Sequence, residues 1–453
     1  MQLTGRIVLR SPGGHRPTFL AVLRAEWIGI AVLLMACGAP VGTPTGTDRS
    51  PTPSSTSSLS PTPAPSTPTP GATLEPTPAA IGNWRELTGK PVPYLHDLVR
   101  RANGFIGVGR TSDPQGAGPA VWRSADGRAW TEVPIELEAE LDPEVLESLY
   151  VLTADDRLVA ISGTAALGVA ESEDGRTWTY VSPEQDACPA DLAAHDEVVV
   201  AVGGVGPCQM GGFGQPGAWV SVDLADWTNA WPETGPGFLH GVVATAGGFV
   251  AWGTVAEDAD SLVCEIGCFV DPVREPYAGA PWFSTDGASW QRLTDPAPFA
   301  GATIEGMATA EQGTLAIGWA PSADAPQLQE LRAWMSNDGA SWTLLDIGPP
   351  FAGVEPGMGI GIGGGPSGFA VWTQSVPGVT TMVWASVDGR SWDAGTELPV
   401  AMLHGVESLG EGLIAYGTVE DADSGISVPC DKDDVVEGRC RTVPAVWILD
   451  RVP

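Results

Sequence analysis

Three histidines and one glutamate recur at the same place in different parts of the chain. His96, His240 and His404 each follow a leucine, and Glu305 takes the matching position when residues are counted to the next hairpin. Asp97 comes directly after His96. Imidazole nitrogens and carboxylate oxygens can bind a transition metal or orient a polar ligand. Histidines packed between repeats are the interpretation that we favour, and a ligand-binding rim at these residues is the alternative.

Two acidic segments, 256–279 and 420–444, offer a second kind of chemistry. Each contains Glu-Asp-Ala-Asp-Ser, which places Asp258 and Asp260 in the first and Asp421 and Asp423 in the second. Clustered carboxylate oxygens are ligands that Ca²⁺ prefers. Calcium sites in these loops are therefore one interpretation. Neither loop has the full spacing of a calcium-binding motif, so we favour solvated acidic loops.

A motif of the form Ser-x-Asp-Gly-x-x-Trp positions these residues, because it divides the chain into repeats. Its copies are Ser124–Trp130, Ser172–Trp178, Ser221–Trp227, Ser284–Trp290, Ser336–Trp342 and Ser386–Trp392. The third copy has Leu224 in place of glycine. The motif aspartates are 48, 49, 63, 52 and 50 residues apart. A period near 50 residues, with about four short apolar runs in each unit, predicts a β-propeller.

The two ends of the repeat region complement each other. Seven apolar runs match the second strand of a unit, yet the motif occurs only six times. Residues 83–87 resemble the strand that follows a motif, and residues 445–450 resemble the strand that precedes one. The sequence therefore predicts an all-β, seven-bladed propeller over 81–453. Its blades have four antiparallel strands, and the N-terminal strand pairs with the C-terminal strand to close the ring.

The residue types of the motif suit a tight turn between the third and fourth strands. Asp and Ser side chains can accept hydrogen bonds from the backbone of the turn. Glycine adopts a positive φ at little cost. The tryptophan can bury a large apolar area between blades. A turn repeated on every blade cannot be one active site, so we expect the motif to be structural.

On these residues the chain resembles the Asp-box family, also called BNR repeats. The family includes sialidases, sortilin-type receptors, some xyloglucanases and photosystem II assembly factors. The resemblance covers 81–453 and implies a propeller fold, with enzymes and binding proteins both represented. A sialidase would clamp a carboxylate with three arginines from different blades, but the first strands contain only Arg100 and Arg101. Other hydrolase signatures, such as Gly-x-Ser-x-Gly and His-Glu-x-x-His, are absent from the sequence.

The sequence therefore favours a non-catalytic propeller that binds a glycan or a protein through its loop-rich face. In such a ring, the loops from strand 2 to strand 3 and from strand 4 to the next blade share one face. Both long acidic segments lie on that face. A sialidase-like enzyme or another glycoside hydrolase is the alternative, because inverting hydrolysis needs only two carboxyl groups several ångströms apart.

The first eighty residues predict export and tethering. An apolar run at 27–36 follows several arginines and ends in Leu-Met-Ala-Cys, which resembles a bacterial lipobox. We expect residues 1–36 to be a lipoprotein signal peptide and Cys37 to carry the lipid. Residues 37–80, rich in Pro, Thr and Ser, would be a disordered linker. The protein would then lie in the bacterial cell envelope, lipid-anchored on the outer side of the cytoplasmic membrane or at the cell surface.

The seven cysteines fit this location. Six lie in three close groups, which predicts disulfides within each group. The groups are Cys188 with Cys208, Cys264 with Cys268, and Cys430 with Cys440. The remaining one is Cys37, the expected site of lipid attachment.

Charge limits the classes of partner. The net charge is −33, with 55 acidic and 22 basic residues. Such a polyanion is a poor nucleic-acid binder, and it favours cationic partners or metal ions. We expect a monomer that contacts the membrane only through its lipid anchor.

Overall fold

The computed structural model describes the chain from residue 84 to residue 452, with gaps. The described ranges are 84–87, 92–111, 119–133, 135–137, 149–154, 157–162, 169–181, 187–205, 214–232, 235–256, 262–264, 268–270, 279–294, 298–322, 328–346, 351, 354–355, 358–374, 381–400, 402–420 and 442–452. None of these segments forms a helix with the length and hydropathy of a membrane span.

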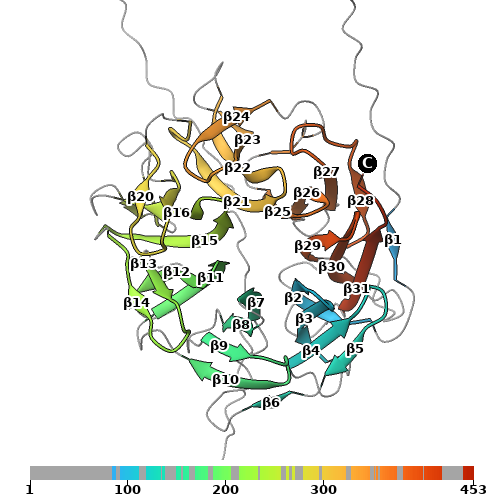
Figure 1. Ribbon diagram of the computed structural model, residues 1–453. Coiled ribbons are helices and arrows are strands. Elements are labelled where there is room, and N and C mark those ends of the chain that lie inside the picture. Colours follow the sequence, from blue (N-terminus) through green and yellow to red (C-terminus); the bar gives the residue numbers. More distant parts are fainter. Residues whose placement is uncertain are drawn as a thin grey trace, which may run out of the picture.

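Seven four-stranded antiparallel sheets stand around a central axis, which confirms the predicted propeller (Figure 1). Blade 1 contains β2 (Tyr94–Arg101), β3 (Gly104–Arg110), β4 (Pro119–Ser124) and β5 (Thr131–Val133). Blade 2 contains β7 (Leu149–Ala154), β8 (Arg157–Ser162), β9 (Val169–Ser172) and β10 (Thr177–Val181). The short strand β6 (Glu136–Leu137) joins blade 2 in parallel with β10. Blade 3 contains β11 (Ala187–His195), β12 (Val198–Val205), β13 (Gln215–Ser221) and β14 (Thr228–Asn229).

The remaining blades repeat the same order. Blade 4 contains β15 (Gly237–Thr245), β16 (Gly248–Val255), β19 (Trp282–Ser284) and β20 (Gln291–Arg292), with a side hairpin of β17 (Leu262–Cys264) and β18 (Cys268–Val270). Blade 5 contains β21 (Thr303–Ala310), β22 (Gly313–Pro321), β23 (Gln329–Ser336) and β24 (Trp342–Leu345). Blade 6 contains β25 (Gly359–Gly365), β26 (Gly368–Gln374), β27 (Thr381–Ser386) and β28 (Thr396–Leu398). Blade 7 contains β29 (Met402–Leu409), β30 (Gly412–Glu420), β31 (Thr442–Leu449) and β1 (Arg85–Glu86).

Blade 7 closes the ring with strands from both ends of the chain, as the sequence predicts. Strand β1 pairs antiparallel with β31, so that Arg85 lies opposite Ile448 and Glu86 opposite Trp447. The Leu87 N–H donates to the Val446 carbonyl at 2.8 Å. Trp84 packs against the apolar cluster that includes Trp447. The outer edge of β31 is thereby covered, which removes an exposed pairing edge at this seam.

The core lies between blades and depends on the periodic tryptophans. The tryptophan of the third strand is buried in every blade that carries one, namely Trp122, Trp219, Trp282, Trp334, Trp384 and Trp447. Each residue of this size buries a large apolar area, so burial between neighbouring sheets is the main force that holds them together.

The Ser-x-Asp-Gly-x-x-Trp turn has the predicted geometry. In every copy the aspartate Oδ1 accepts two backbone hydrogen bonds, from the second and third residues after it, at 2.7–3.1 Å. The motif glycines have φ between 68° and 81°, and Leu224 adopts the same region at 66°. In the first five copies the tryptophan Nε1 donates to the carbonyl of the glycine or of Leu224. The motif is therefore a structural turn that joins the third and fourth strands of a blade.

Candidate functional site

The inner strands share an irregularity that positions the candidate residues. Five of the seven first strands, β2, β11, β15, β21 and β29, have a register shift near their start. The residues at these bulges are His96, Ala190, His240, Glu305 and His404. A bulge bends the strand and re-aims the side chains at and beside it. The positions that the sequence aligns are thus structurally equivalent.

The structure brings His96 and His404 together, because blades 1 and 7 are neighbours. Their ring centroids are 5.2 Å apart in an edge-on arrangement. Tyr94 completes this cluster, at 5.2 Å from His96 and 6.0 Å from His404. His240 lies elsewhere on the ring, where it contacts Phe238 at 5.6 Å. Within the described ranges, no three His, Cys, Asp or Glu side chains are arranged to hold a metal ion.

Burial keeps two of these histidines neutral. The pKa of His404 is lowered to about 4 by burial, and the positive charge of Arg110 adds to the effect. The pKa of His240 is lowered to about 4 by burial alone. The Nε2 atom of His404 is buried and has no hydrogen-bond partner among the residues that the structure describes. At neutral pH it is therefore an uncharged group with unused hydrogen-bonding capacity.

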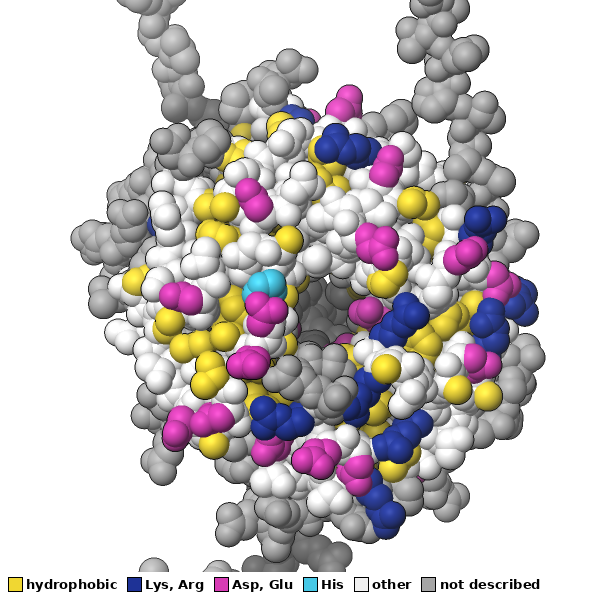
Figure 2. Space-filling view, in the orientation of Figure 1, with side chains coloured by type: hydrophobic (Ala, Val, Ile, Leu, Met, Phe, Trp, Pro, Cys, Tyr) yellow, Lys and Arg dark blue, Asp and Glu magenta, His cyan; other side chains and the backbone are white. Residues whose placement is uncertain are grey.

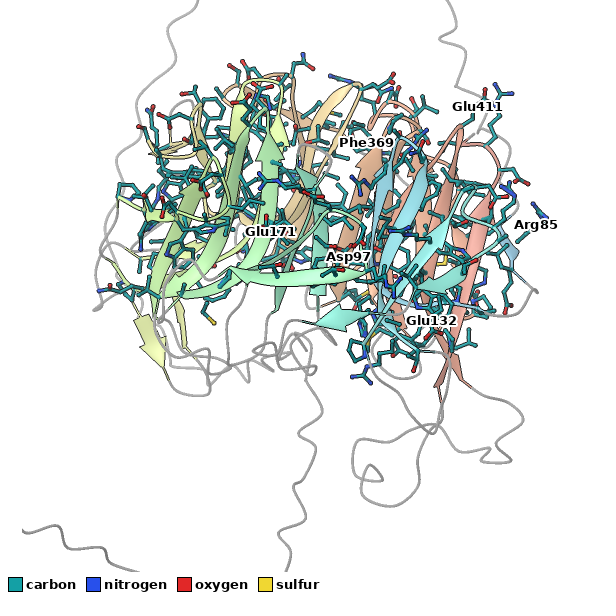
Figure 3. The ribbon with its side chains drawn as sticks, turned by 60° about the horizontal axis from the view of Figure 1, so that its bottom comes forward. Arg85, Asp97, Glu132, Glu171, Phe369 and Glu411 are labelled. Atoms are coloured by element: carbon teal, nitrogen blue, oxygen red, sulfur yellow. The ribbon has the colours of Figure 1, made fainter. Side chains whose placement is uncertain are left out.

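A cavity of about 280 Å³ lies among the inner strands. Four carboxyl groups line it, one each from blades 1, 3, 5 and 7: Asp97, Asp191, Glu305 and Glu407. His404 and the aromatic residues Trp252, Trp372 and Tyr416 also belong to the lining. Figure 2 shows the hollow at the centre of the ring with Asp and Glu side chains near its edge. In Figure 3 Asp97 lies in the interior of the ring, away from the exposed Glu411.

Asp97 and Asp191 occupy the same place, directly after the bulge, on blades 1 and 3. In each, Oδ1 accepts the backbone N–H of the following leucine at 2.8 Å. Asp191 Oδ2 also accepts the Val242 N–H of the next blade at 2.9 Å. The Tyr416 hydroxyl donates to Asp97 Oδ1 at 3.3 Å. Because backbone groups fix them, the two carboxyl groups are held in set orientations on the cavity wall.

Where these carboxyl groups are missing, glycine makes room for an aromatic ring. Gly241 and Gly405 follow the bulges of blades 4 and 7, and Gly361 lies on the regular strand β25. A Cβ at Gly241 or Gly361 would lie 2.1 Å from the indole of Trp252 or Trp372. A Cβ at Gly405 would lie 2.3 Å from the Tyr416 hydroxyl. The glycines therefore let large rings from the second strands reach the cavity.

The protein around the cavity disfavours ionised carboxyl groups. Burial raises the pKa of Asp191 to about 7, and the charge of Asp97 contributes to the rise. Burial and the charge of Asp97 raise the pKa of Glu407 well above its usual value. Desolvation by the surrounding ring raises the pKa of Glu305 to about 7, although the residue keeps an exposed surface. Near neutral pH these cavity carboxyl groups thus retain protons that exposed carboxylates would lose.

Of the residues that the sequence singles out, Asp97, Glu305 and His404 line the cavity, and His96 lies next to His404. His240 is not among the described lining residues. Sequence reasoning missed Asp191, Glu407 and the aromatic wall. Asp191-Leu192 repeats the Asp97-Leu98 pair at the same place in its strand, which is a signal that the sequence contains. Glu407 has no such counterpart.

Other predicted sites lie mainly outside the described residues. These are Cys37, Cys208, Asp258, Asp260, Asp421, Asp423, Cys430 and Cys440. Cys188 is disulfide-bonded, and its pairing with Cys208 stays a prediction. Cys264 and Cys268 lie opposite each other in the β17–β18 hairpin, and their disulfide also stays a prediction.

Comparison with known proteins assigns no family to the chain. No protein-family model matches the chain, and no curated protein matches it by sequence. Among solved structures, U3-55K is 12% identical, with 82% of this chain and 100% of that chain covered and a TM-score of 0.44. The WD40 β-propeller domain of Doa1 is 11% identical, with 73% and 92% covered and a TM-score of 0.42. An α-L-arabinanase from Penicillium chrysogenum, complexed with arabinobiose, is 12% identical, with 80% and 94% covered and a TM-score of 0.39.

Proposed function

We propose that this chain is a non-catalytic, lipid-anchored propeller of the Asp-box type that binds a carbohydrate with its channel. The observation that carries the proposal is the cavity, whose wall combines four carboxyl groups with three aromatic side chains from six blades. Ligand pockets typically combine apolar and aromatic walls with a few placed polar groups. Carboxyl oxygens pair with sugar hydroxyls, and ring faces pack against sugar C–H groups.

The size of the cavity favours one sugar unit at a time. Its volume of about 280 Å³ lies near the lower end of ligand pockets, which span roughly 300–1,000 Å³. A chain end or a side branch of a glycan would enter, and the rest would lie against the loop-rich face. The acidic loops with Asp258, Asp260, Asp421 and Asp423, with calcium where it binds, would contribute to that outer contact.

The predicted lipid anchor and linker agree with a role in binding a glycan outside the cell. Signal-peptide cleavage before Cys37 and lipid attachment there would hold the propeller outside the cytoplasmic membrane, at the end of the linker 37–80. Disulfides at Cys188–Cys208, Cys264–Cys268 and Cys430–Cys440 would suit that oxidising location. A protein partner on the same face is the other ligand that the sequence favours, and binding assays separate it from a glycan.

A glycan array with the full-length protein tests the proposal. We expect binding to a subset of glycans, weakened at least about tenfold by Asp191→Asn, because the amide replaces a fixed acceptor on the cavity wall. The matched control is Asp196→Asn, the same exchange on the exposed hairpin that follows β11. Binding to no glycan, or equal binding by Asp191→Asn and the unchanged protein, would contradict the proposal.

Glycoside hydrolysis is the second candidate, and one observation favours it. Glu305 has a pKa of about 7 in the same cavity as other carboxyl groups, and a carboxylic acid that stays protonated near neutral pH can act as a general acid. Chromatography of glycans incubated with the protein measures this directly. Product formation that Glu305→Gln abolishes would make the chain an enzyme and would remove the non-catalytic part of our proposal.

A further inference from the structure

We propose that the sugar bound in the cavity carries a protonated amine, so that the ligand class is an amino-sugar glycan with free amino groups. This inference rests on the proposed carbohydrate function and narrows it. Three features of the cavity wall support it. The charged groups of the wall are acidic, they interact electrostatically, and several buried ring nitrogens in the wall have no hydrogen-bond partner among the residues that the structure describes.

The charges of the wall have one sign. The groups that face the cavity and can titrate are Asp97, Asp191, Glu305, Glu407, His404 and Tyr416. Among the described lining residues there is no Lys or Arg, and burial keeps His404 neutral. Arg110 acts on His404 and is not part of the lining. A neutral sugar would leave the repulsion among these carboxyl groups in place, whereas an ammonium group would relieve it.

The carboxyl groups interact across blades. Asp97 on blade 1 acts electrostatically on Asp191 of blade 3 and on Glu407 of blade 7. Three side chains from separate sheets are thus within electrostatic range of one another along the wall of one cavity. Rigid placement adds to this effect, because Asp97 and Asp191 are oriented by the N–H groups of Leu98 and Leu192. A bound ammonium would therefore meet preset acceptors.

The aromatic wall is a second, independent feature. Trp252 and Trp372 line the cavity and are only 7% and 5% exposed. Their Nε1 atoms are buried and have no hydrogen-bond partner among the described residues, and the same holds for Nε2 of His404. An unpaired buried donor is costly, and a hydrogen bond to a ligand hydroxyl would relieve that cost. Indole rings near a cavity also attract cations.

An amino sugar carries both kinds of group that this cavity would bind, namely hydroxyl groups and a positive charge. Hydroxyl groups can accept hydrogen bonds from indole and imidazole N–H groups, and the ammonium supplies the positive charge. The net charge of −33 raises the local concentration of cationic ligands at the molecule. Binding would convert protonated carboxyl groups of the empty cavity into carboxylates, and the released protons would pass to the buffer.

Calorimetry with two matched ligands tests the inference. The probes are a glucosamine oligomer and the same oligomer with every amine N-acetylated, titrated into the full-length protein at pH 5.5. We expect the free-amine oligomer to bind at least about tenfold more tightly. Titration in two buffers of different ionisation enthalpy should show net proton release for this ligand. Added salt should weaken it more than the acetylated oligomer.

Variants connect the effect to the cavity. Glu407→Gln should weaken the free-amine oligomer about tenfold and change the acetylated one little. Glu411→Gln, the same exchange on the exposed hairpin of blade 7, should change neither. Equal affinity for the two oligomers overturns the inference and leaves carbohydrate binding standing. If neither these oligomers nor any array glycan binds, the proposed function fails as well. Preferential binding of oligolysine would replace the amino sugar with a basic peptide and overturn the inference.

Discussion

The acidic side chains of the motif turns and those of the channel experience opposite environments. Asp126, Asp174 and Asp338 lie in exposed turns, where backbone N–H groups lower the pKa of each carboxyl group. Asp191 and Glu407 lie in the channel, where burial raises the pKa. The turn carboxylates have their partners within the same turn. The channel carboxyl groups are disfavoured as anions mainly by burial, and the charge of Asp97 adds to this effect at Asp191 and Glu407. Shifted pKa values of this kind are common at binding sites, which agrees with the function that we propose.

We therefore expect different residues of the ring to determine stability and ligand binding: the motif turns the first, and the channel wall the second. Each motif turn fixes its own hairpin, and its glycine faces the preceding blade, as Gly127 faces Leu409 and Gly287 faces Val200. In the channel, Asp191 and Asp97 accept hydrogen bonds from neighbouring blades, whereas burial and the charge of Asp97 make ionised Glu407 unfavourable to folding. A change in a turn should thus lower stability with little effect on ligands, and the removal of the Glu407 charge should raise stability at neutral pH and weaken ligand binding.

The largest expected effect comes from a motif glycine. Gly287→Val places a branched side chain at φ 73°, with its Cβ only 2.5 Å from Val200 Cγ2 of blade 3. Overpacking and backbone strain together should cost about 3 kcal/mol or more of unfolding free energy. Chemical denaturation measures the loss. The control is Gly410→Ala, at φ 64° with nothing within 4 Å of its Cβ, where only about 1 kcal/mol should be lost. Equal losses in both would mean that blade contact at the motif is unimportant.

Leu224 shows why the sequence predicts the turn better than the channel. The motif keeps its hydrogen bonds when leucine replaces glycine, because Leu224 still adopts a positive φ and buries its side chain in the apolar cluster with Val159 and Trp219. The hydrogen bonds of the turn join residues that are close in sequence, so the turn can be recognised from the sequence alone. The repeat length, the number of blades and the closure by β1 can then be predicted from the spacing of the turns. The channel wall depends instead on one-residue bulges, which decide where a strand residue points.

Site residues could be predicted from the sequence only where they occupy equivalent positions in several repeats. Asp97, Glu305 and His404 could be found because they lie at or next to a bulge that falls at the same count in five of the seven blades. Asp191 was hidden because alanine occupies its bulge position, and Glu407 because no other blade has a carboxyl group there. The contribution of Trp252 depends on Gly241, a contact between neighbouring strands that no local pattern reveals.

A motif aspartate should have a smaller effect than a motif glycine. Asp338→Ala removes the acceptor for the N–H groups of Ala340 and Ser341, at 2.9 and 2.7 Å. Because the turn is exposed, water replaces part of this loss, and we expect about 1–2 kcal/mol less stability at pH 7. The folded pKa is lowered, so the contribution is present above about pH 4 and is lost as pH falls through the lowered folded value. Denaturation at pH 7 and pH 3 should therefore show a difference that shrinks in acid.

The smallest expected change has the opposite sign and comes from the channel. Glu407→Gln removes a carboxyl group whose folded pKa is raised by burial and by Asp97. Such a group stabilises the folded state relative to the unfolded one only below its unfolded pKa, near 4.5, and this contribution is lost as pH rises toward the folded value. The variant should match the unchanged protein at pH 4 and gain about 1 kcal/mol at pH 8. The matched control is Glu411→Gln, the same exchange on the exposed hairpin of blade 7. A Glu407→Gln protein that is less stable at pH 8 would mean that the channel carboxyl groups support the ring, and the contrast between turn and channel would disappear.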